Sequence, residues 1–148
     1  MKRTLALLLA ISAAAVMATA NPAAATRRSG TLHVTKECSQ YDPTKAGSFC
    51  TITASNIKAI KPGAKVVYAS PADLTRGVLD SDLVIEGPGH NSAFGHVVLD
   101  LATLTGEVTL SGGTGPLARF HAGPIAVACP DFPACTWEGP YSFGPDDD

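Results

Sequence analysis

The stretch Glu107-Val-Thr-Leu-Ser-Gly-Gly-Thr-Gly-Pro-Leu-Ala-Arg-Phe-His-Ala-Gly123 decides the fold of this chain of 148 residues. It begins as an alternating segment, because Val108 and Leu110 point to one side of an extended chain and polar residues separate them. The turn Gly112 to Gly115 then interrupts the alternation, since glycine takes a positive φ without steric cost. A second apolar segment, Leu117 to Phe120, follows the turn. This pattern predicts two β-strands joined by a wide, glycine-rich turn.

The same alternation recurs on both sides of this turn. Strands are predicted at 31–35, 50–54, 64–69, 78–86, 94–101, 107–111, 124–129 and 136–143. Turn residues separate these segments at close intervals, which is typical of an all-β sandwich or barrel. Short connections between consecutive strands favour a meander, and closing the sheet removes its exposed edges. We therefore expect a small antiparallel β-barrel of about eight strands.

The N-terminus has the features of a secretory signal peptide over residues 1–20. Lys2 and Arg3 precede an uncharged apolar run that ends in small residues, so cleavage is expected after Ala20, with Ala25 as a second candidate. A membrane anchor is the weaker alternative, because the run is shorter than the roughly 20 residues of a spanning helix. Beyond the signal peptide we expect a flexible leader at 21–30, a single barrel domain at 31–143 and an acidic tail at 144–148. The expected location is outside the cell or in a periplasm, without embedding in a membrane.

Four cysteines indicate two disulfides, because an even number is typical of an exported domain. Their short separations favour Cys38–Cys50 and Cys129–Cys135, and a long-range pair such as Cys38–Cys135 is the alternative. No pair has the closer Cys-x-x-Cys spacing of a metal site. The cysteines therefore predict a disulfide-stapled domain without a metal.

The charge of the chain argues against a nucleic-acid partner. There are 11 basic and 13 acidic side chains, and two of the basic ones lie in the signal segment. The mature chain therefore carries a net charge of about −4. Nucleic-acid binding depends on phosphate neutralisation by clustered Lys and Arg, which a net acidic surface opposes.

The segment Ser111 to Gly123 resembles a motif of the allene oxide cyclase and dirigent proteins. Those families carry a Gly-Gly-Thr/Ser-Gly turn, an apolar or aromatic residue two positions on, and a further glycine at the end of the next segment. Gly106-Glu-Val-Thr-Leu and Trp137-Glu-Gly-Pro-Tyr-Ser-Phe fit the strands around that turn, so the resemblance covers the last third of the chain. It implies an eight-stranded antiparallel barrel with a central cavity. Leu117 stands where the families favour Phe, and Arg119 where the cyclase-like motif often has Gly, so no catalytic residue is carried over.

Candidate ligand-binding residues come from the turn and from the large aromatic side chains. Arg119 and His121 lie just past the turn, and Tyr68 and Trp137 suit either the core or the mouth of a barrel. By strand parity His96 lies on a polar face, and no two histidines have the spacing that presets a metal site. The sequence therefore predicts neither a metal nor a cofactor.

No nucleophile, base and orienting group fall at a recognisable spacing. The leading hypothesis is therefore a non-catalytic binding or interaction domain, with an apolar small molecule as its expected ligand. The first alternative is an isomerase or cyclase-like enzyme, which requires polar groups such as His96, Asp100, Glu107 and Thr109 to point into the barrel. The second is a secreted structural protein with a filled core. The oligomeric state stays open.

Overall fold

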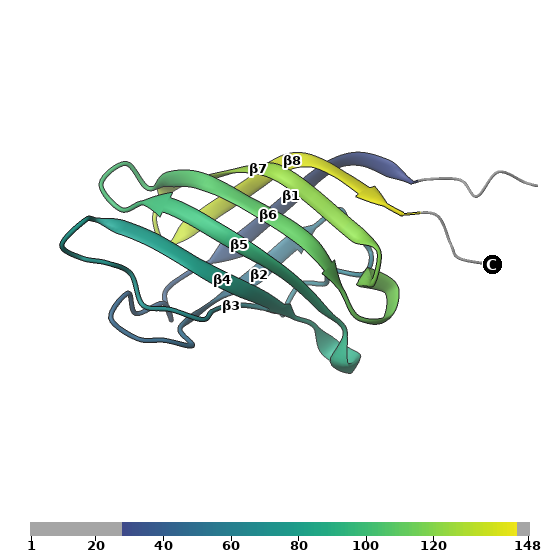
Figure 1. Cartoon of the computed structure of the whole chain (residues 1–148), viewed down its shortest axis with the longest axis horizontal. Helices are drawn as coiled ribbons and strands as arrows, with labels where there is room; N and C mark the ends of the chain where they lie inside the picture. The colour runs from purple at the N-terminus through teal and green to yellow at the C-terminus, as the bar shows by residue number, and fades with distance from the viewer. Residues whose placement is uncertain (1–27, 145–148) are drawn as a thin grey trace, which may run out of the picture.

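The computed structural model describes residues 28–144, which form a closed barrel of eight strands (Figure 1). The strands are β1 (Ser29–Glu37), β2 (Phe49–Ser55), β3 (Lys65–Tyr68), β4 (Val78–Glu86), β5 (Ser92–Asp100), β6 (Thr105–Gly113), β7 (Phe120–Asp131) and β8 (Ala134–Phe143). Each strand pairs antiparallel with the next, and β8 pairs antiparallel with β1 to close the sheet. The predicted all-β antiparallel barrel is confirmed.

The barrel closes along a long seam between β1 and β8. The pairing runs from Ser29 opposite Ser142 to Glu37 opposite Ala134 without a shift in register. β1 begins two residues before the expected start of the barrel domain. The predicted signal peptide, and most of the leader and of the acidic tail, lie outside the described residues. Within residues 28–144 no helix is long and apolar enough to cross a membrane.

The glycine-rich turn connects β6 to β7 as expected. Gly112 and Gly115 have φ values of 113° and 53°, which residues with a Cβ atom rarely adopt. At Gly113 a Cβ would collide with the backbone oxygen of Ser92, so this position needs glycine for a different reason. The turn ends in a single 3-10 turn, Gly115–Leu117.

β7 is one strand of 12 residues, where the sequence predicted two shorter apolar segments. Leu117 belongs to the preceding turn, and the strand continues from Phe120 through Pro124 to Asp131. Proline cannot donate a ladder hydrogen bond, and the pairing with β8 shifts register between Ala122 and Ala126 to accommodate it. This bulge allows β7 to continue through Pro124, although a proline usually predicts the end of a strand.

The inner face of the barrel is apolar. In β5 and β6 the inward residues are Val97, Leu99, Val108 and Leu110, all buried. The alternating polar residues His96, Asp100, Glu107 and Thr109 face outward; His96 is partly exposed and the other three are exposed. The enzyme alternative placed these four side chains inside the barrel, and that placement is wrong because the apolar set faces the interior instead.

The two ends of the barrel differ in how they are filled. The packed end, on the right in Figure 1, is formed by the β2–β3, β4–β5 and β6–β7 connections and by the outer ends of β1 and β8. There the rings of Phe120, Tyr141 and Phe143 contact one another, with centroids 5.0 to 6.0 Å apart. Buried Leu117 and Ile57 belong to the same end. The cavity end, on the left, is formed by the β1–β2, β3–β4, β5–β6 and β7–β8 connections.

Candidate ligand-binding cavity

A cavity of about 340 Å³ lies inside the cavity end of the barrel. Its lining comes from the β1–β2, β5–β6 and β7–β8 connections and the adjoining strands: Lys36, Cys38, Tyr41, Pro43, Cys50, Tyr68, Leu79, Val97, Leu99, Leu101, Leu104, Val127, Cys129, Phe132 and Cys135. Small-molecule pockets in proteins usually have about 300–1,000 Å³ and mostly apolar walls with a few polar groups. This cavity has the composition of such a pocket and a volume near the lower limit.

Both disulfides lie in the wall of this cavity. Cys38 is bonded to Cys50, and Cys129 is bonded to Cys135, as the short sequence separations predict. The alternative pair Cys38–Cys135 is not formed, although these two sulfurs approach to 3.9 Å across the β1–β8 seam. The bonds tie β1 to β2 and β7 to β8, so they fix the wall of the cavity on both sides of the seam.

Lys36 is the one Lys or Arg in the cavity lining. Its side chain lies inside the barrel and is only 5% exposed. The Nζ atom donates a hydrogen bond of 2.5 Å to the Tyr68 hydroxyl. It also lies 4.9 Å from the ring centroid of Trp137 and 5.2 Å from that of Tyr68. Two aromatic faces and one hydroxyl therefore hold this amine.

Burial is the main cause of the pKa shifts of Lys36 and Tyr68. None of the ion pairs within residues 28–144 includes Lys36. Loss of hydration disfavours its ammonium form and lowers the pKa of Lys36 from 10.5 to about 7. Burial, followed by the influence of Tyr41, raises the pKa of Tyr68. Near neutral pH the pair thus combines a protonated phenol with an amine that is neutral for much of the time.

The polar groups around the cavity are mainly hydrogen-bond donors. The ring of Tyr41 packs edge-on against that of Tyr68, with centroids 5.4 Å apart. The buried Tyr41 hydroxyl has no hydrogen-bond partner within the described part of the chain. Among residues 28–144 the Tyr68 hydroxyl has only the Cys50 sulfur, at 3.8 Å, as its own acceptor. A ligand with an acceptor oxygen would satisfy these donors, whose burial without a partner costs free energy.

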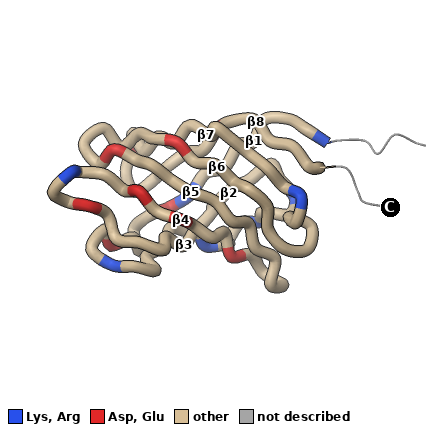
Figure 2. The backbone as a smooth tube through the Cα atoms, viewed as in Figure 1, with Lys and Arg blue, Asp and Glu red and all other residues tan. Residues whose placement is uncertain are grey.

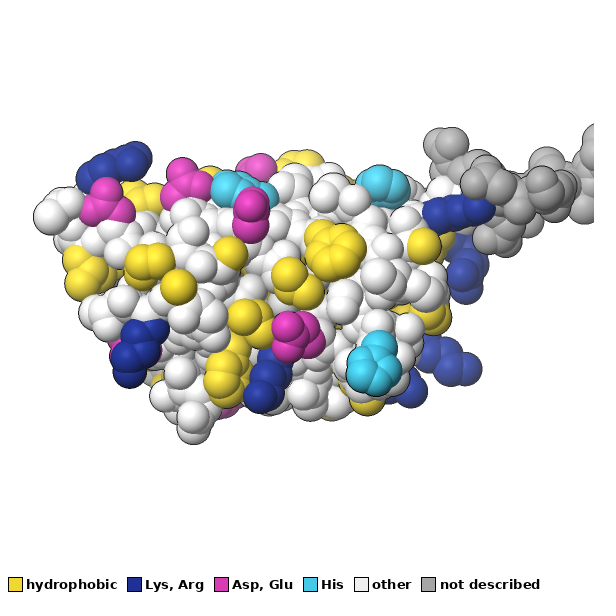
Figure 3. Space-filling view, turned by 60° about the horizontal axis from the view of Figure 1, so that its bottom comes forward, with side chains coloured by type: hydrophobic (Ala, Val, Ile, Leu, Met, Phe, Trp, Pro, Cys, Tyr) yellow, Lys and Arg dark blue, Asp and Glu magenta, His cyan; other side chains and the backbone are white. Residues whose placement is uncertain are grey.

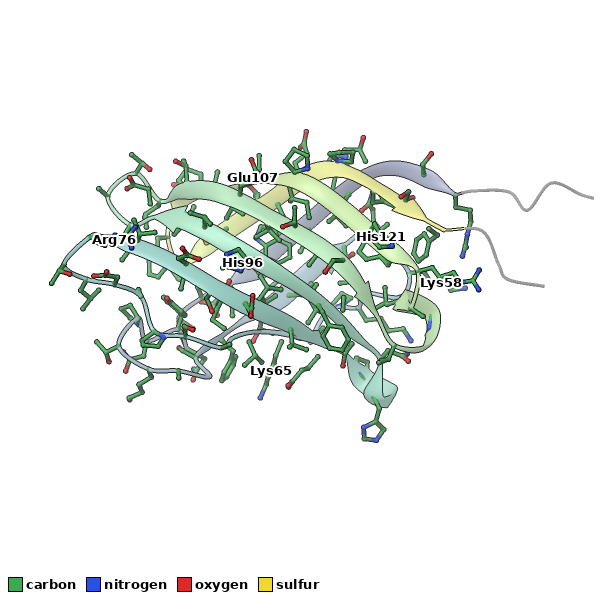
Figure 4. All side chains as sticks on the ribbon, viewed as in Figure 1. Lys58, Lys65, Arg76, His96, Glu107 and His121 are labelled. Carbon is green, nitrogen blue, oxygen red and sulfur yellow. A yellow bond between two sulfur atoms is a disulfide. The ribbon has the colours of Figure 1, made fainter. Side chains whose placement is uncertain are left out.

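The four predicted ligand-binding residues do not all come together, although Tyr68 and Trp137 both lie beside Lys36. Tyr68 lines the cavity, and Trp137 is buried beside Lys36. His121 lies on the outer surface of β7 towards the packed end (Figure 4). The backbone oxygen of Arg119, just before β7, accepts a hydrogen bond from Gly144 at the same end. Six residues of extended strand, about 20 Å, separate His121 from Val127 in the cavity wall.

Lys36 was not predicted, although the sequence contains a signal for it. Leu32 and Val34 occupy the inner face of β1, and the next position in the period of two is Lys36. A lysine at an inward position breaks the binary pattern of a strand. That break, at the end of the strand where Cys38 also lies, points to the interior amine.

A separate cluster of titratable groups lies on the outer face of β4 and β5. His96 Nε2 is 2.9 Å from Asp80 Oδ1, and His96 Nδ1 is 2.9 Å from Asp82 Oδ1. Figure 3 shows acidic side chains gathered around a histidine on this face. The hydrogen bond that His96 donates to Asp82 is the main cause that raises the pKa of His96. All three groups are well exposed, so the cluster is a surface ion-pair network. Within residues 28–144 no three His, Cys, Asp or Glu side chains are placed to hold a metal ion.

The loops at the cavity end are held by local hydrogen bonds. Asp42 Oδ1 accepts from the backbone nitrogen and the hydroxyl of Thr44, and these bonds, together with the contact to Lys45, lower the pKa of Asp42 to about 2. Asp73 makes the same two contacts with Thr75 in the β3–β4 connection. Charged residues are otherwise spread over the loops and the outer face, with both signs interspersed (Figure 2). The mouth of the cavity is thus framed by loops with defined turns.

Comparison with known proteins found no matching family model, curated protein or solved structure. The function is therefore inferred from the cavity and the groups that line it.

Proposed function

We propose that this protein binds an apolar small molecule inside the cavity end of the barrel. The observation that carries the proposal is the cavity of about 340 Å³, bounded mainly by apolar side chains and holding the buried Lys36–Tyr68 pair in its wall. A structural protein would gain stability by filling this volume with side chains. The unfilled volume favours a ligand.

Burial of apolar surface supplies the driving force for such a ligand. Each Å² removed from water contributes about 25 cal/mol, before the cost of immobilising the ligand. The polar end of the molecule is expected to face Lys36 and Tyr68, where an acceptor oxygen meets buried donors. The expected ligand is therefore an apolar chain or ring system with one terminal oxygen function.

The family and the location of the protein belong to the same proposal. We place the barrel with the allene oxide cyclase and dirigent proteins, on the support of the glycine-rich turn Gly112 to Gly115 and the closed eight-strand meander. Export after cleavage near Ala20 is supported by two disulfides, which persist in oxidising compartments. A role in holding or carrying an apolar molecule outside the cell fits both.

Two neighbouring valines on β5 provide the test. Val97 is 2% exposed and lines the cavity, whereas Val98 is 47% exposed on the outside of the same strand. Calorimetric titration of the purified protein with octanol is expected to show saturable binding at one site per chain. Val97→Phe places a ring in the cavity and is expected to weaken binding at least about tenfold, which corresponds to about 1.4 kcal/mol.

Val98→Phe is the matched control, because it adds the same ring on the outer face. It is expected to leave the affinity for octanol unchanged, and circular dichroism checks that both variants fold. Equal loss of binding in both variants, or no saturable binding in the parent protein, would contradict the proposed site.

A further inference from the structure

We propose that Lys36 captures a carbonyl-bearing apolar ligand, an aldehyde about the size of octanal, as a covalent imine. The inference rests on the proposed function, because the cavity must first hold the apolar part of the ligand next to the amine. It specifies the chemical class of the ligand, the protein atom that reacts with it and the covalent bond that forms.

The position of the amine is the first argument. Lys36 Nζ belongs to the cavity wall and is shielded from bulk water, with 5% of the residue exposed. Lys58 and Lys61, in the β2–β3 connection at the packed end, are exposed. A molecule inside the cavity therefore meets one lysine, and it meets that lysine without competing bulk solvent.

The state of the amine is the second argument. An ammonium ion cannot attack a carbonyl, and a desolvated lysine in an apolar pocket is a recognised way to obtain the neutral nucleophile. Lys36 has no acidic partner within the described residues that would hold the proton. Its pKa of about 7 leaves a large neutral fraction at neutral pH.

The Tyr68 hydroxyl, 2.5 Å from Nζ, supplies the proton transfers that imine formation needs. The nitrogen lone pair forms a bond to the carbonyl carbon, the C=O π electrons move to oxygen, and that oxygen gains a proton as nitrogen loses one. The resulting carbinolamine then loses its hydroxyl group, with one further proton, as water, and the C=N double bond forms. The balance is aldehyde plus amine giving imine plus water, with no oxidant or reductant. Tyr68 remains protonated between the steps, since burial raises its pKa.

Borohydride trapping of the purified full chain with octanal tests the inference. Reduction converts the imine into a stable secondary amine, which adds the mass of octanal less one oxygen atom. Peptide mapping is expected to locate this mass on Lys36. Labelling there should exceed labelling at Lys58 or Lys61 by at least about tenfold at neutral pH, because the cavity holds the aldehyde next to Lys36, whereas Lys58 and Lys61 are exposed at the other end.

Three variants separate the roles of the residues. Lys36→Met is expected to abolish the adduct at the cavity, and Lys58→Met, the exposed control, is expected to leave it unchanged. Tyr68→Phe keeps the amine but removes the proton-transfer group, so the rate of trapping should fall by about a hundredfold. An unchanged rate in Tyr68→Phe would overturn the role given to this hydroxyl.

Octanol has no carbonyl group and cannot form an imine, so it tests binding alone. Comparing octanol with octanal therefore distinguishes a failure of the imine from a failure of the proposed binding function. Trp137 is the only tryptophan of the chain and lies beside Lys36, so its fluorescence reports whether the cavity is filled. Octanol binding without octanal trapping at Lys36 would overturn the imine and leave the binding function intact. Absence of both would overturn the binding function as well. Octanoate binding that requires Lys36, without any trapped octanal, would assign Lys36 to pairing with an anion and would also overturn the imine.

Discussion

The two ends of this barrel are built from the same alternating strands and yet hold different contents. At the packed end, the rings of Phe120, Tyr141 and Phe143 meet, and the pocket beside them has a more polar lining that includes Lys58 and Lys61. At the cavity end, aliphatic side chains such as Leu79 face a cavity of about 340 Å³, and a lysine replaces an apolar residue on the inner face. Strand periodicity decides which side chains point inward, whereas their size and polarity decide where space is left.

The largest expected effect uses the same substitution at both ends. Leu117 at the packed end is 1% exposed, and Leu79 at the cavity wall is 4% exposed. Leu117→Ala is expected to lower the free energy of unfolding by about 3 kcal/mol, because it opens a new void among packed rings. Leu79→Ala is expected to cost about half as much, since its side chain already borders a cavity and has fewer packed neighbours to lose. Urea denaturation measures both, and equal losses would break the distinction between the ends.

The disulfides provide the next effect, because both belong to the cavity end. Replacing Cys129 and Cys135 with alanine removes a disulfide between two residues that are six positions apart in the sequence. The expected loss in the free energy of unfolding is about 2–3 kcal/mol, from the larger conformational entropy of the unfolded chain. The affinity for octanol should fall as well, since the bond fixes the cavity wall. A variant that loses stability but binds octanol as before would show that the bond has no part in shaping the cavity.

The buried amine predicts a dependence of stability on pH. The pKa of Lys36 is about 7 in the folded protein, below its ordinary value of 10.5. Between these values the unfolded chain binds more protons, so stability should rise as pH increases through this window and should be lower below about pH 7. Lys36→Met is expected to remove this rise and to stabilise the protein by about 1–3 kcal/mol near pH 6, because no charge is then buried. Denaturation at several pH values compares the two proteins, and parallel pH profiles would contradict a buried lysine.

The smallest effect is expected on the outer face. The pKa of His96 is raised chiefly by its hydrogen bond to Asp82 and then by Asp80. A raised histidine pKa contributes stability that is present below about pH 6.5 and lost as pH rises through the folded value. Because the cluster is exposed, His96→Gln should cost less than about 1 kcal/mol at low pH and nothing near pH 9. It should also leave octanol affinity unchanged, and a change would link the outer face to the cavity.

The fold could be predicted from the sequence because its signals are local. Alternation over a few residues marks a strand, and the glycines at Gly112 and Gly115 mark a turn whose positive φ values the structure contains. The short separation of Cys38 and Cys50 likewise predicted the correct disulfide. Pro124 misled because a local rule treats proline as a break, whereas a register shift against β8 absorbs it.

The cavity could not be predicted in the same way, because it depends on residues that meet only after closure. Tyr68 was selected for its size and does line the cavity, whereas Arg119 and His121 were selected for lying next to the turn and belong near the packed end. Lys36 was overlooked because lysine on a strand is usually exposed. Its parity with Val34 contained the information, but its partners Tyr68 and Trp137 come from distant parts of the chain.

The central claim is that only one end of the barrel takes a ligand, and methyl NMR during an octanol titration tests it most directly. Leu79, Leu99 and Val127 report on the cavity end, and Leu117, Ile57 and Ile60 report on the packed end. Saturable shifts confined to the first group, together with a change at Trp137, are the predicted result. Shifts concentrated in the second group, or no saturable shift in either group, would contradict the account.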